Sequence, residues 1–247
     1  MIDAIVMAAG EGSRLRPLTE RWPKPVLPID GRPVIATLLR ELATAGCRRA
    51  TIVTGHLAEQ VESLVGDGNG FGLEVAFVRQ PGVLGSADAV SRALAGGAAP
   101  PVLVTAADTV FVDGDVARFV DRAGGAAAAV AVRRDPPPDP PGRFAVRVED
   151  GRVTRVLDND PANPFSGAPL WLLGPEVARF LGELPGPPYE LSGALQRAVD
   201  EGLHVAGVEI GRTRDLTHPA DVVVENFAYL APAARGSSVS SSHDTAM

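Results

Sequence analysis

Cysteine, positive charge and long apolar runs are all scarce in this sequence, and each scarcity excludes a class of protein. The single cysteine, Cys47, excludes an internal disulfide and a metal site built from cysteines, and we expect it in the core. Lys plus Arg total 23 against 30 for Asp plus Glu, and the resulting net charge of −7 disfavours a nucleic-acid partner. No apolar run is long enough to span a bilayer. The N-terminal MIDAIVMAAG lacks the basic segment of a signal peptide, so we expect a cytoplasmic protein without a membrane partner.

The first half of the sequence alternates short apolar runs with segments of helical period. The apolar runs predict strands over residues 2–7, 50–54, 73–78 and 101–106. The helical periods predict helices over 33–45 and 56–65, and a third that starts from Ser86 as its N-cap. Such alternation predicts a mostly parallel sheet with helices on its faces.

The second half changes character, because its apolar runs are short and lie close together. They predict strands over residues 126–132, 143–149, 152–157 and 169–173, with a hairpin turn at Glu149, Asp150 and Gly151. A helix over 190–201, a strand over 204–210 and a helix over 219–230 follow, whereas the proline-rich 133–142 is predicted as a loop. We predict a single α/β domain over 1–231, with a Rossmann-like, mixed but mostly parallel sheet flanked by helices. The domain consists of a nucleotide half over about 1–125 and a small antiparallel lobe over about 126–202, the acceptor half. A disordered tail covers 232–247.

A glycine-rich segment, AAGEGSRLRPLTERWPKPVLPI (8–29), follows the first predicted strand directly. Glycines there let backbone N–H groups approach a polyphosphate without a Cβ in the way. The segment lacks the Gly-Lys-Ser/Thr of a Walker loop, and Leu15 stands where a dinucleotide fingerprint needs a small residue. Arg14, Arg16 and Lys24 carry positive charge past the end of the sheet. The segment therefore predicts a site for a nucleoside triphosphate.

This segment resembles the signature loop of the sugar-phosphate nucleotidyltransferase family, AAGxGxRLxPLTxxxPKPxLPI. The resemblance continues through VTGHLAEQVESLVGDG (53–68), RQPGVLGSADAV (79–90), VTAADTVF (104–111) and DLTHPADVVVENF (215–227). It implies Mg²⁺-dependent transfer of a nucleotidyl group from a nucleoside triphosphate to a sugar 1-phosphate, with release of pyrophosphate. Assembly into a homo-oligomer stays open.

The family's nucleotide site can be carried over to matching positions of this chain. The resemblance implies that seven residues hold the nucleotide with their backbone or side-chain atoms: Ala8, Ala9, Gly10, Gly12, Gln80, Gly85 and Ser86. It further implies that Arg14 and Lys24 act as catalytic residues on the phosphates, together with Asp108.

Two aspartates are the metal ligands that the resemblance implies. Asp108 follows a predicted buried strand, which places its carboxylate at the carboxyl edge of the sheet, and Asp215 lies in a segment resembling the family's DxxTPxD. Glu209 is the alternative second ligand. Mg²⁺ takes oxygen ligands and commonly one or two carboxylates. No general base is required, because the attacking phosphate is already ionised near neutral pH, and we interpret the four histidines as structural or solvated.

The sequence departs from the family on the acceptor side. Typical members carry a Glu-Lys-Pro whose lysine binds the sugar phosphate, but here Asp158, Asn159 and Asp160 precede the proline, and Gly193 replaces a common Asp. Either Arg143 or Arg147 supplies the missing charge, or the acceptor differs, or activity has been lost. We predict an acceptor site that includes Arg143, Asn159 and Ser166. A cytidylyltransferase for a polyol, cyclitol or choline phosphate and a non-catalytic nucleotide-sensing protein remain alternatives.

Overall fold

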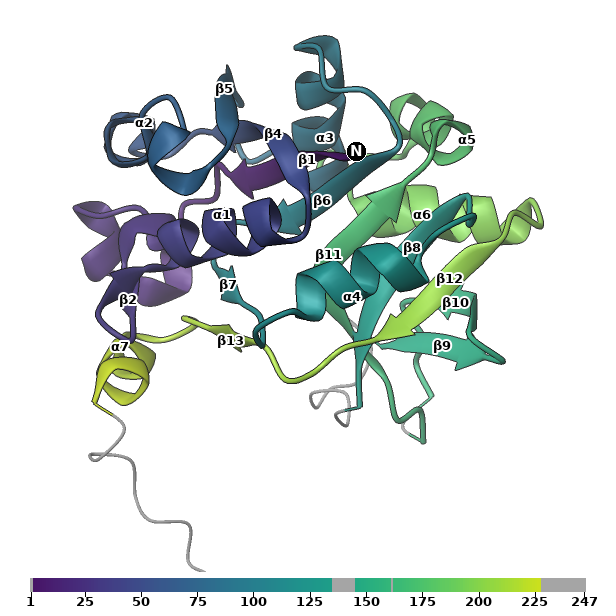
Figure 1. Ribbon diagram of the computed structural model, residues 1–247. Helices are drawn as coiled ribbons and strands as arrows, with labels where there is room; N and C mark the ends of the chain where they lie inside the picture. Colours follow the sequence, from purple (N-terminus) through teal and green to yellow (C-terminus); the bar gives the residue numbers. More distant parts are fainter. Residues whose placement is uncertain (1, 135–144, 161, 228–247) are drawn as a thin grey trace, which may run out of the picture.

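The computed structural model describes residues 2–134, 145–160 and 162–227, and its centre is a nine-stranded sheet (Figure 1). The strand order is β5-β4-β1-β6-β11-β8-β12-β10-β9. In chain order these strands are β1 (Ile2–Ala8), β4 (Cys47–Thr54), β5 (Glu74–Arg79), β6 (Val102–Ala106), β8 (Ala128–Arg133), β9 (Val146–Glu149), β10 (Arg152–Val156), β11 (Ser166–Leu173) and β12 (Val205–Glu209). The predicted tail and Arg143 lie outside the described residues.

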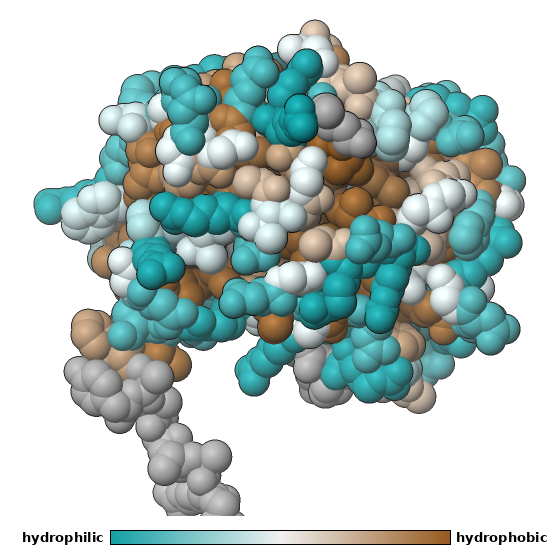
Figure 2. Space-filling model, viewed as in Figure 1, coloured by the Kyte–Doolittle hydropathy of each residue, from teal (hydrophilic) through white to brown (hydrophobic). Residues whose placement is uncertain are grey.

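Helices cover both faces of this sheet, as predicted. The elements are α1 (Val34–Thr44), α2 (Ala58–Val65), α3 (Ser86–Ala95), α4 (Asp115–Arg122), α5 (Pro175–Ala178), α6 (Leu191–Asp200) and α7 (Pro219–Asn226). One apolar cluster packs α1, α2 and α4 against the sheet, and a second packs α3, α5 and α6 against its other face. Figure 2 shows polar and apolar residues interspersed on the face that carries α1 and α4. None of the helices in the described ranges is long and apolar enough to cross a membrane.

The position of β1 in the middle of the sheet follows from its sequence. Parallel strands that are covered on both faces read as continuous apolar runs, and Ala4, Ile5 and Val6 are fully buried. This strand pairs in parallel with β4 on one side and β6 on the other. Ligands of open α/β sheets bind outside the carboxyl ends of strands where the order reverses, and β1 ends at such a point.

The strands predicted as an antiparallel lobe are continuous with the central sheet. The antiparallel strand β11 lies between β6 and β8, and the β9–β10 hairpin forms one edge. Asp150 and Gly151 both have positive φ, as a two-residue hairpin turn requires, so the predicted turn is confirmed. The mixed, mostly parallel fold class is confirmed as well.

Two small antiparallel ladders lie beside the main sheet. One joins β2 (Pro28–Ile29) to β3 (Arg32–Pro33), and the other joins β7 (Thr109–Val110) to β13 (Arg214–Asp215). Both are near α7, which is the last described helix (Figure 1). The first is a local hairpin, whereas the second joins segments about a hundred residues apart in the sequence.

Three expectations about individual residues and helices can be compared with the structure. Cys47 is 3% exposed, as predicted for a core residue, and burial raises the pKa of its thiol to about 11. The prediction that Ser86 caps α3 is wrong: Gly85 occupies the N-cap position, and the Ser86 hydroxyl accepts the Leu191 N–H at the start of α6. The helix α4 was not predicted.

Candidate active site

A cavity of about 370 Å³ opens at the carboxyl ends of β1 and β6. The two strands are adjacent, with Met7 in register with Ala106, so the residues that follow them come together. The cavity is lined by the predicted loop residues Ala8, Gly10, Gly12 and Arg14, by Lys24, by Asp108 and by Thr217. The glycine loop, two cations and an aspartate therefore meet in one cavity, although Ala8 and Asp108 are 100 residues apart in the sequence.

The shape of the glycine loop is fixed from beneath by two polar side chains. Gly12 has φ +61°, and an added Cβ would lie 2.9 Å from the Thr19 methyl group. The buried Thr19 hydroxyl donates to the Gly12 carbonyl at 2.9 Å. His56 holds the same loop at two points, since its ring Nε2 donates to the Thr19 carbonyl at 2.6 Å and its backbone N–H donates to the Ala9 carbonyl. His56 is structural, as predicted, but its link to the loop was not foreseen.

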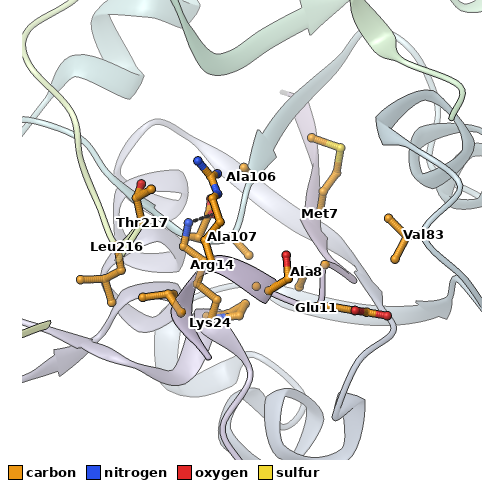
Figure 3. Close-up of a pocket in the computed structure, with 16 residues that line it drawn as sticks. Met7, Ala8, Glu11, Arg14, Lys24, Val83, Ala106, Ala107, Leu216 and Thr217 are labelled. Carbon is orange, nitrogen blue, oxygen red and sulfur yellow. Dashed lines mark ion pairs between the residues drawn. The ribbon is translucent and has the colours of Figure 1, made fainter. Parts of the chain in front are cut away.

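The side chains of Lys24 and Asp108 form an ion pair inside the cavity. Their Nζ and Oδ2 atoms are 2.5 Å apart, and the two side chains are 13% and 30% exposed. Arg14 is exposed and has no ion-pair partner among the described residues. Figure 3 shows Arg14 and Lys24 on one side of the cavity and Val83 on the opposite side. The cavity thus holds an exposed arginine and a lysine paired with Asp108, both beside the glycine loop.

Asp215 lies next to the cavity through the β7–β13 ladder. It is in register with Thr109, the residue after Asp108, and the Thr217 hydroxyl donates to its carboxylate at 2.9 Å. Asp108 and Asp215 thus present carboxylate oxygens on neighbouring strands, a donor set that fits Mg²⁺. No group of three or more His, Cys, Asp or Glu side chains with metal-binding geometry occurs in the described ranges. A metal ion here would need substrate oxygens to complete its coordination.

The remaining residues of the predicted nucleotide site do not line the cavity. Gln80 is 7% exposed, and its amide donates to the Gly85 carbonyl and to Asp88. Ser86 donates to Glu190 and accepts from Leu191. Their roles in this structure are to order the loop that carries Val83 into the cavity wall.

On the acceptor side, the carboxylates that replace the family's Glu-Lys-Pro are bound to Arg147. Its guanidinium contacts Asp158 at 3.1 Å and Asp160 at 2.9 Å, and Asp158 also accepts the Asn163 amide. The Ala162 N–H and Arg147 lower the pKa of Asp160 below its usual range, and the two carboxylates raise the pKa of Arg147. Arg147 thus belongs to a closed network.

The predicted acceptor residues differ in their surroundings. Asn159 is exposed beside the Arg147 network, whereas Ser166 is 2% exposed and its hydroxyl has no hydrogen-bond partner among the described residues. Glu209, the alternative metal ligand, accepts two hydrogen bonds from Arg134 at 3.2 Å each. Its carboxylate is therefore already engaged.

Comparison with solved structures places the fold among nucleotidyltransferases. A protein assigned as a glucose-1-phosphate thymidylyltransferase from Bacillus anthracis, solved with sucrose, superposes with a TM-score of 0.80 at 22% identity, covering 92% of this chain and 94% of the other. The inositol-1-phosphate CTP transferase from T. maritima superposes with a TM-score of 0.76 at 21% identity, covering 90% and 91%. At these identities the likeness is one of fold.

Comparison of sequences shows the family to which the chain belongs. The bifunctional protein GlmU of Acidovorax sp. (strain JS42) is 33% identical over 231 residues, which cover 85% of this chain and 46% of GlmU. The chain thus spans about half the length of GlmU and of several other curated relatives that it matches. The profile of the nucleotidyl transferase family matches residues 3–166. With its glycine loop, two cations and Asp108 gathered in one cavity, the chain belongs to the nucleotidyl transferase family, that of the sugar-phosphate nucleotidyltransferases.

Proposed function

We propose that this chain transfers a nucleotidyl group from a nucleoside triphosphate to a sugar 1-phosphate in a Mg²⁺-dependent reaction. The observation that carries this proposal is the Lys24–Asp108 pair facing the glycine loop inside the cavity. A lysine, an exposed arginine and backbone N–H groups suit a triphosphate, and an aspartate beside them suits a phosphate-bound cation. The reaction yields a nucleoside diphosphate sugar and pyrophosphate.

The chemistry requires little beyond positioning and charge. An oxygen of the acceptor phosphate forms a bond to the α-phosphorus, and the bond from that phosphorus to the β-phosphate oxygen breaks, so pyrophosphate leaves. The acceptor phosphate is largely ionised at neutral pH because its second pKa is about 6, so no residue needs to remove a proton. Arg14 and Lys24 would stabilise the charge that builds on the phosphates.

Asp108 and Asp215 are the residues that would hold the metal ion. Bound Mg²⁺ would supply positive charge to the transferring phosphate. In the present geometry Lys24 neutralises Asp108, and an arriving triphosphate would offer Lys24 a competing anion. We infer that Lys24 moves from Asp108 to the phosphates when the nucleotide binds, which would leave the Asp108 carboxylate for the cation.

Replacing Asp108 with Asn tests the proposal. The amide keeps the shape of the side chain but removes its charge, so turnover should fall by at least about 100-fold, while the melting temperature changes little. The assay is pyrophosphate release with a panel of nucleoside triphosphates and sugar 1-phosphates, with Mg²⁺ and with EDTA.

Asp113→Asn is the matched control, because Asp113 is an exposed aspartate that follows β7 and lies outside the cavity lining. Its turnover should equal that of the wild type. Full activity of Asp108→Asn, or wild-type activity that EDTA leaves unchanged, would show that the metal assignment is wrong.

A cytidylyltransferase acting on a cyclitol phosphate is the second candidate. It is favoured by the structural likeness to the inositol-1-phosphate CTP transferase and by the altered acceptor side. The same assay distinguishes the two candidates when CTP is paired with phosphorylated cyclitols, polyols and choline. Nucleotide binding without turnover of any pair would instead support a nucleotide-sensing protein.

A further inference from the structure

The acceptor half needs a cation for the acceptor phosphate, because Asp160 stands directly before the proline, where the family has its lysine. This inference rests on the proposed transfer to a phosphorylated acceptor. Arg133 and Arg134 lie at the carboxyl end of β8, and Arg147 lies in β9 beside the residues that replace the Glu-Lys-Pro. Their contacts show which of them could exchange its present partner for a ligand.

Arg147 is bound too firmly to be that cation. Two carboxylates hold its guanidinium, and one of them, Asp158, has a side chain that is only 6% exposed. If Arg147 moved to a ligand, Asp158 would become a buried charge without its cation, which is costly. Arg147 is thus a structural element of the acceptor half.

Arg133 is held by the protein as well. It is the last residue of β8, and its guanidinium donates to the hydroxyl of Thr213, which is 7% exposed. This contact joins β8 to the segment that leads into Asp215. Arg133 therefore positions that segment.

Arg134 differs from both in exposure and in the nature of its partner. Its side chain is 61% exposed and lies over the Phe165 ring at 4.7 Å, which orients the guanidinium. Its two bonds go to one carboxylate, that of Glu209, whose side chain is itself 47% exposed. Exposed ion pairs contribute little to stability, so this contact can be exchanged at low cost.

The strand register places Arg134 on the same edge as Asp108. Along β11, Leu170 is in register with Thr105 of β6, and Ser166 is in register with Arg133 of β8. The end of β8 therefore extends beyond the level of Thr105, and Asp108 lies in the turn that follows β6. Only β11 separates β6 from β8, so the two ends are roughly 10 Å apart laterally. Arg134 and Asp108 therefore follow parallel strands at the same edge of the sheet.

We propose that Arg134 binds the phosphate of the acceptor and replaces the family's lysine from a different strand. Glu209 holds the guanidinium fork until a phosphate offers the same bidentate geometry. The Phe165 ring keeps the guanidinium oriented toward the edge during the exchange. Glu209 also repels the phosphate dianion, so it weakens acceptor binding.

Steady-state kinetics on Arg134 and Glu209 variants test this proposal, with the acceptor that gives turnover in the panel assay. Arg134→Gln should raise the acceptor KM by about 10- to 100-fold and leave the KM of the nucleoside triphosphate unchanged, because charge-assisted hydrogen bonds to the phosphate are lost. Arg134→Lys should recover part of this loss. Glu209→Gln should lower the acceptor KM by up to about fivefold, since a competing carboxylate is removed.

The matched control is Arg155→Gln, which removes an exposed arginine from the same half of the sheet without touching Phe165 or Glu209. It should leave both KM values unchanged. Wild-type turnover combined with an unchanged acceptor KM in Arg134→Gln would overturn the role of Arg134 alone. If no pair of substrates is turned over by the wild type, the proposed function is wrong, and the role of Arg134 is overturned with it.

Discussion

Gly10 and Gly85 both belong to the predicted nucleotide site, yet the protein structure requires a glycine only at Gly85. A Cβ added at Gly10 would meet no protein atom within 4 Å, and Gly10 lines the cavity. A Cβ added at Gly85 would lie 2.3 Å from the Tyr189 carbonyl oxygen, and Gly85 has φ +98°. The fold therefore requires a glycine at position 85. At position 10 the protein leaves room for a side chain, so only a bound ligand could require a glycine there.

Gly10→Ala should leave the melting temperature unchanged and raise the KM of the nucleoside triphosphate by about 10-fold, because the new methyl group occupies space that phosphates would use. Thermal unfolding and pyrophosphate-release kinetics measure the two effects. Gly70→Ala is the control, since Gly70 also has open space around it and lies far along the sequence from the glycine loop. An unchanged KM in Gly10→Ala would argue against a close approach of the nucleotide to this backbone.

Residue roles could be predicted where a local motif carries them. Lys24 and Asp108 were predicted from their registration with the family loop, and they meet in the cavity. The support that Thr19 and His56 give to the glycine loop was not predicted. It depends on a hydrogen bond from the His56 ring to the Thr19 carbonyl, between residues 37 apart in the sequence. The proposed role of Arg134 was not predicted either, because it depends on the register of β8 in the sheet, which sequence patterns do not define.

At the scale of elements, α3 and α6 are joined through their N-termini. The Leu84 carbonyl accepts the Tyr189 N–H at 2.8 Å, and the Tyr189 carbonyl accepts the Ala87 N–H at 2.8 Å. Ser86 completes this joint, since its hydroxyl accepts the Leu191 N–H at 2.8 Å. A loop of the nucleotide half is thereby bound to a helix of the acceptor half.

Ser86→Ala should lower the free energy of unfolding by about 1–2 kcal/mol, because α6 loses the oxygen that caps its first turn. That loss corresponds to a fall in melting temperature of roughly 2–8 °C, which calorimetry can measure. Ser91→Ala on the same helix is the control, because the Ser91 hydroxyl makes no hydrogen bond within the described ranges. A Ser86→Ala protein as stable as the wild type would mean that solvent replaces the cap.

Elements with a clear period were predicted, and short elements were not. The helix α1 lies within one residue of the prediction at each end, because six of its eleven residues are buried apolar residues on one face. The eight-residue α4 was missed because only Val116 and Phe119 form its buried apolar stripe, next to a buried aspartate. The ladders β2–β3 and β7–β13 have two residues per strand, too few for any periodicity.

At the scale of the whole molecule, α7 fastens the end of the glycine segment. The Asn226 amide donates to the Pro28 carbonyl and accepts the Gly31 N–H, both at 2.8 Å. Arg214 bridges Asp30 and Glu225, and this pairing lowers the pKa of Asp30. The helix also leaves apolar side chains at the surface, seen above the grey atoms in Figure 2.

Asn226→Ala should lower the melting temperature by roughly 2–6 °C, because two backbone groups of the β2–β3 turn lose their partner. It should also raise the KM of the nucleoside triphosphate more than that of the acceptor, since the disturbed turn continues from the loop that carries Lys24. Val223→Ala on the exposed side of α7 is the control, and it should change neither quantity. Equal effects of Asn226→Ala on both KM values would contradict a specific link to the nucleotide loop.

The contacts of α7 also determine when the nucleotide site can be completed during synthesis. Gly31 leaves the ribosome 195 residues before the asparagine that binds it. Until that asparagine emerges, the turn after the glycine segment lacks partners for its backbone groups, even though β1, β4 and β6 can already pair. A nascent chain could therefore build the sheet first and close the nucleotide loop last, which makes nucleotide binding a late marker of completed folding.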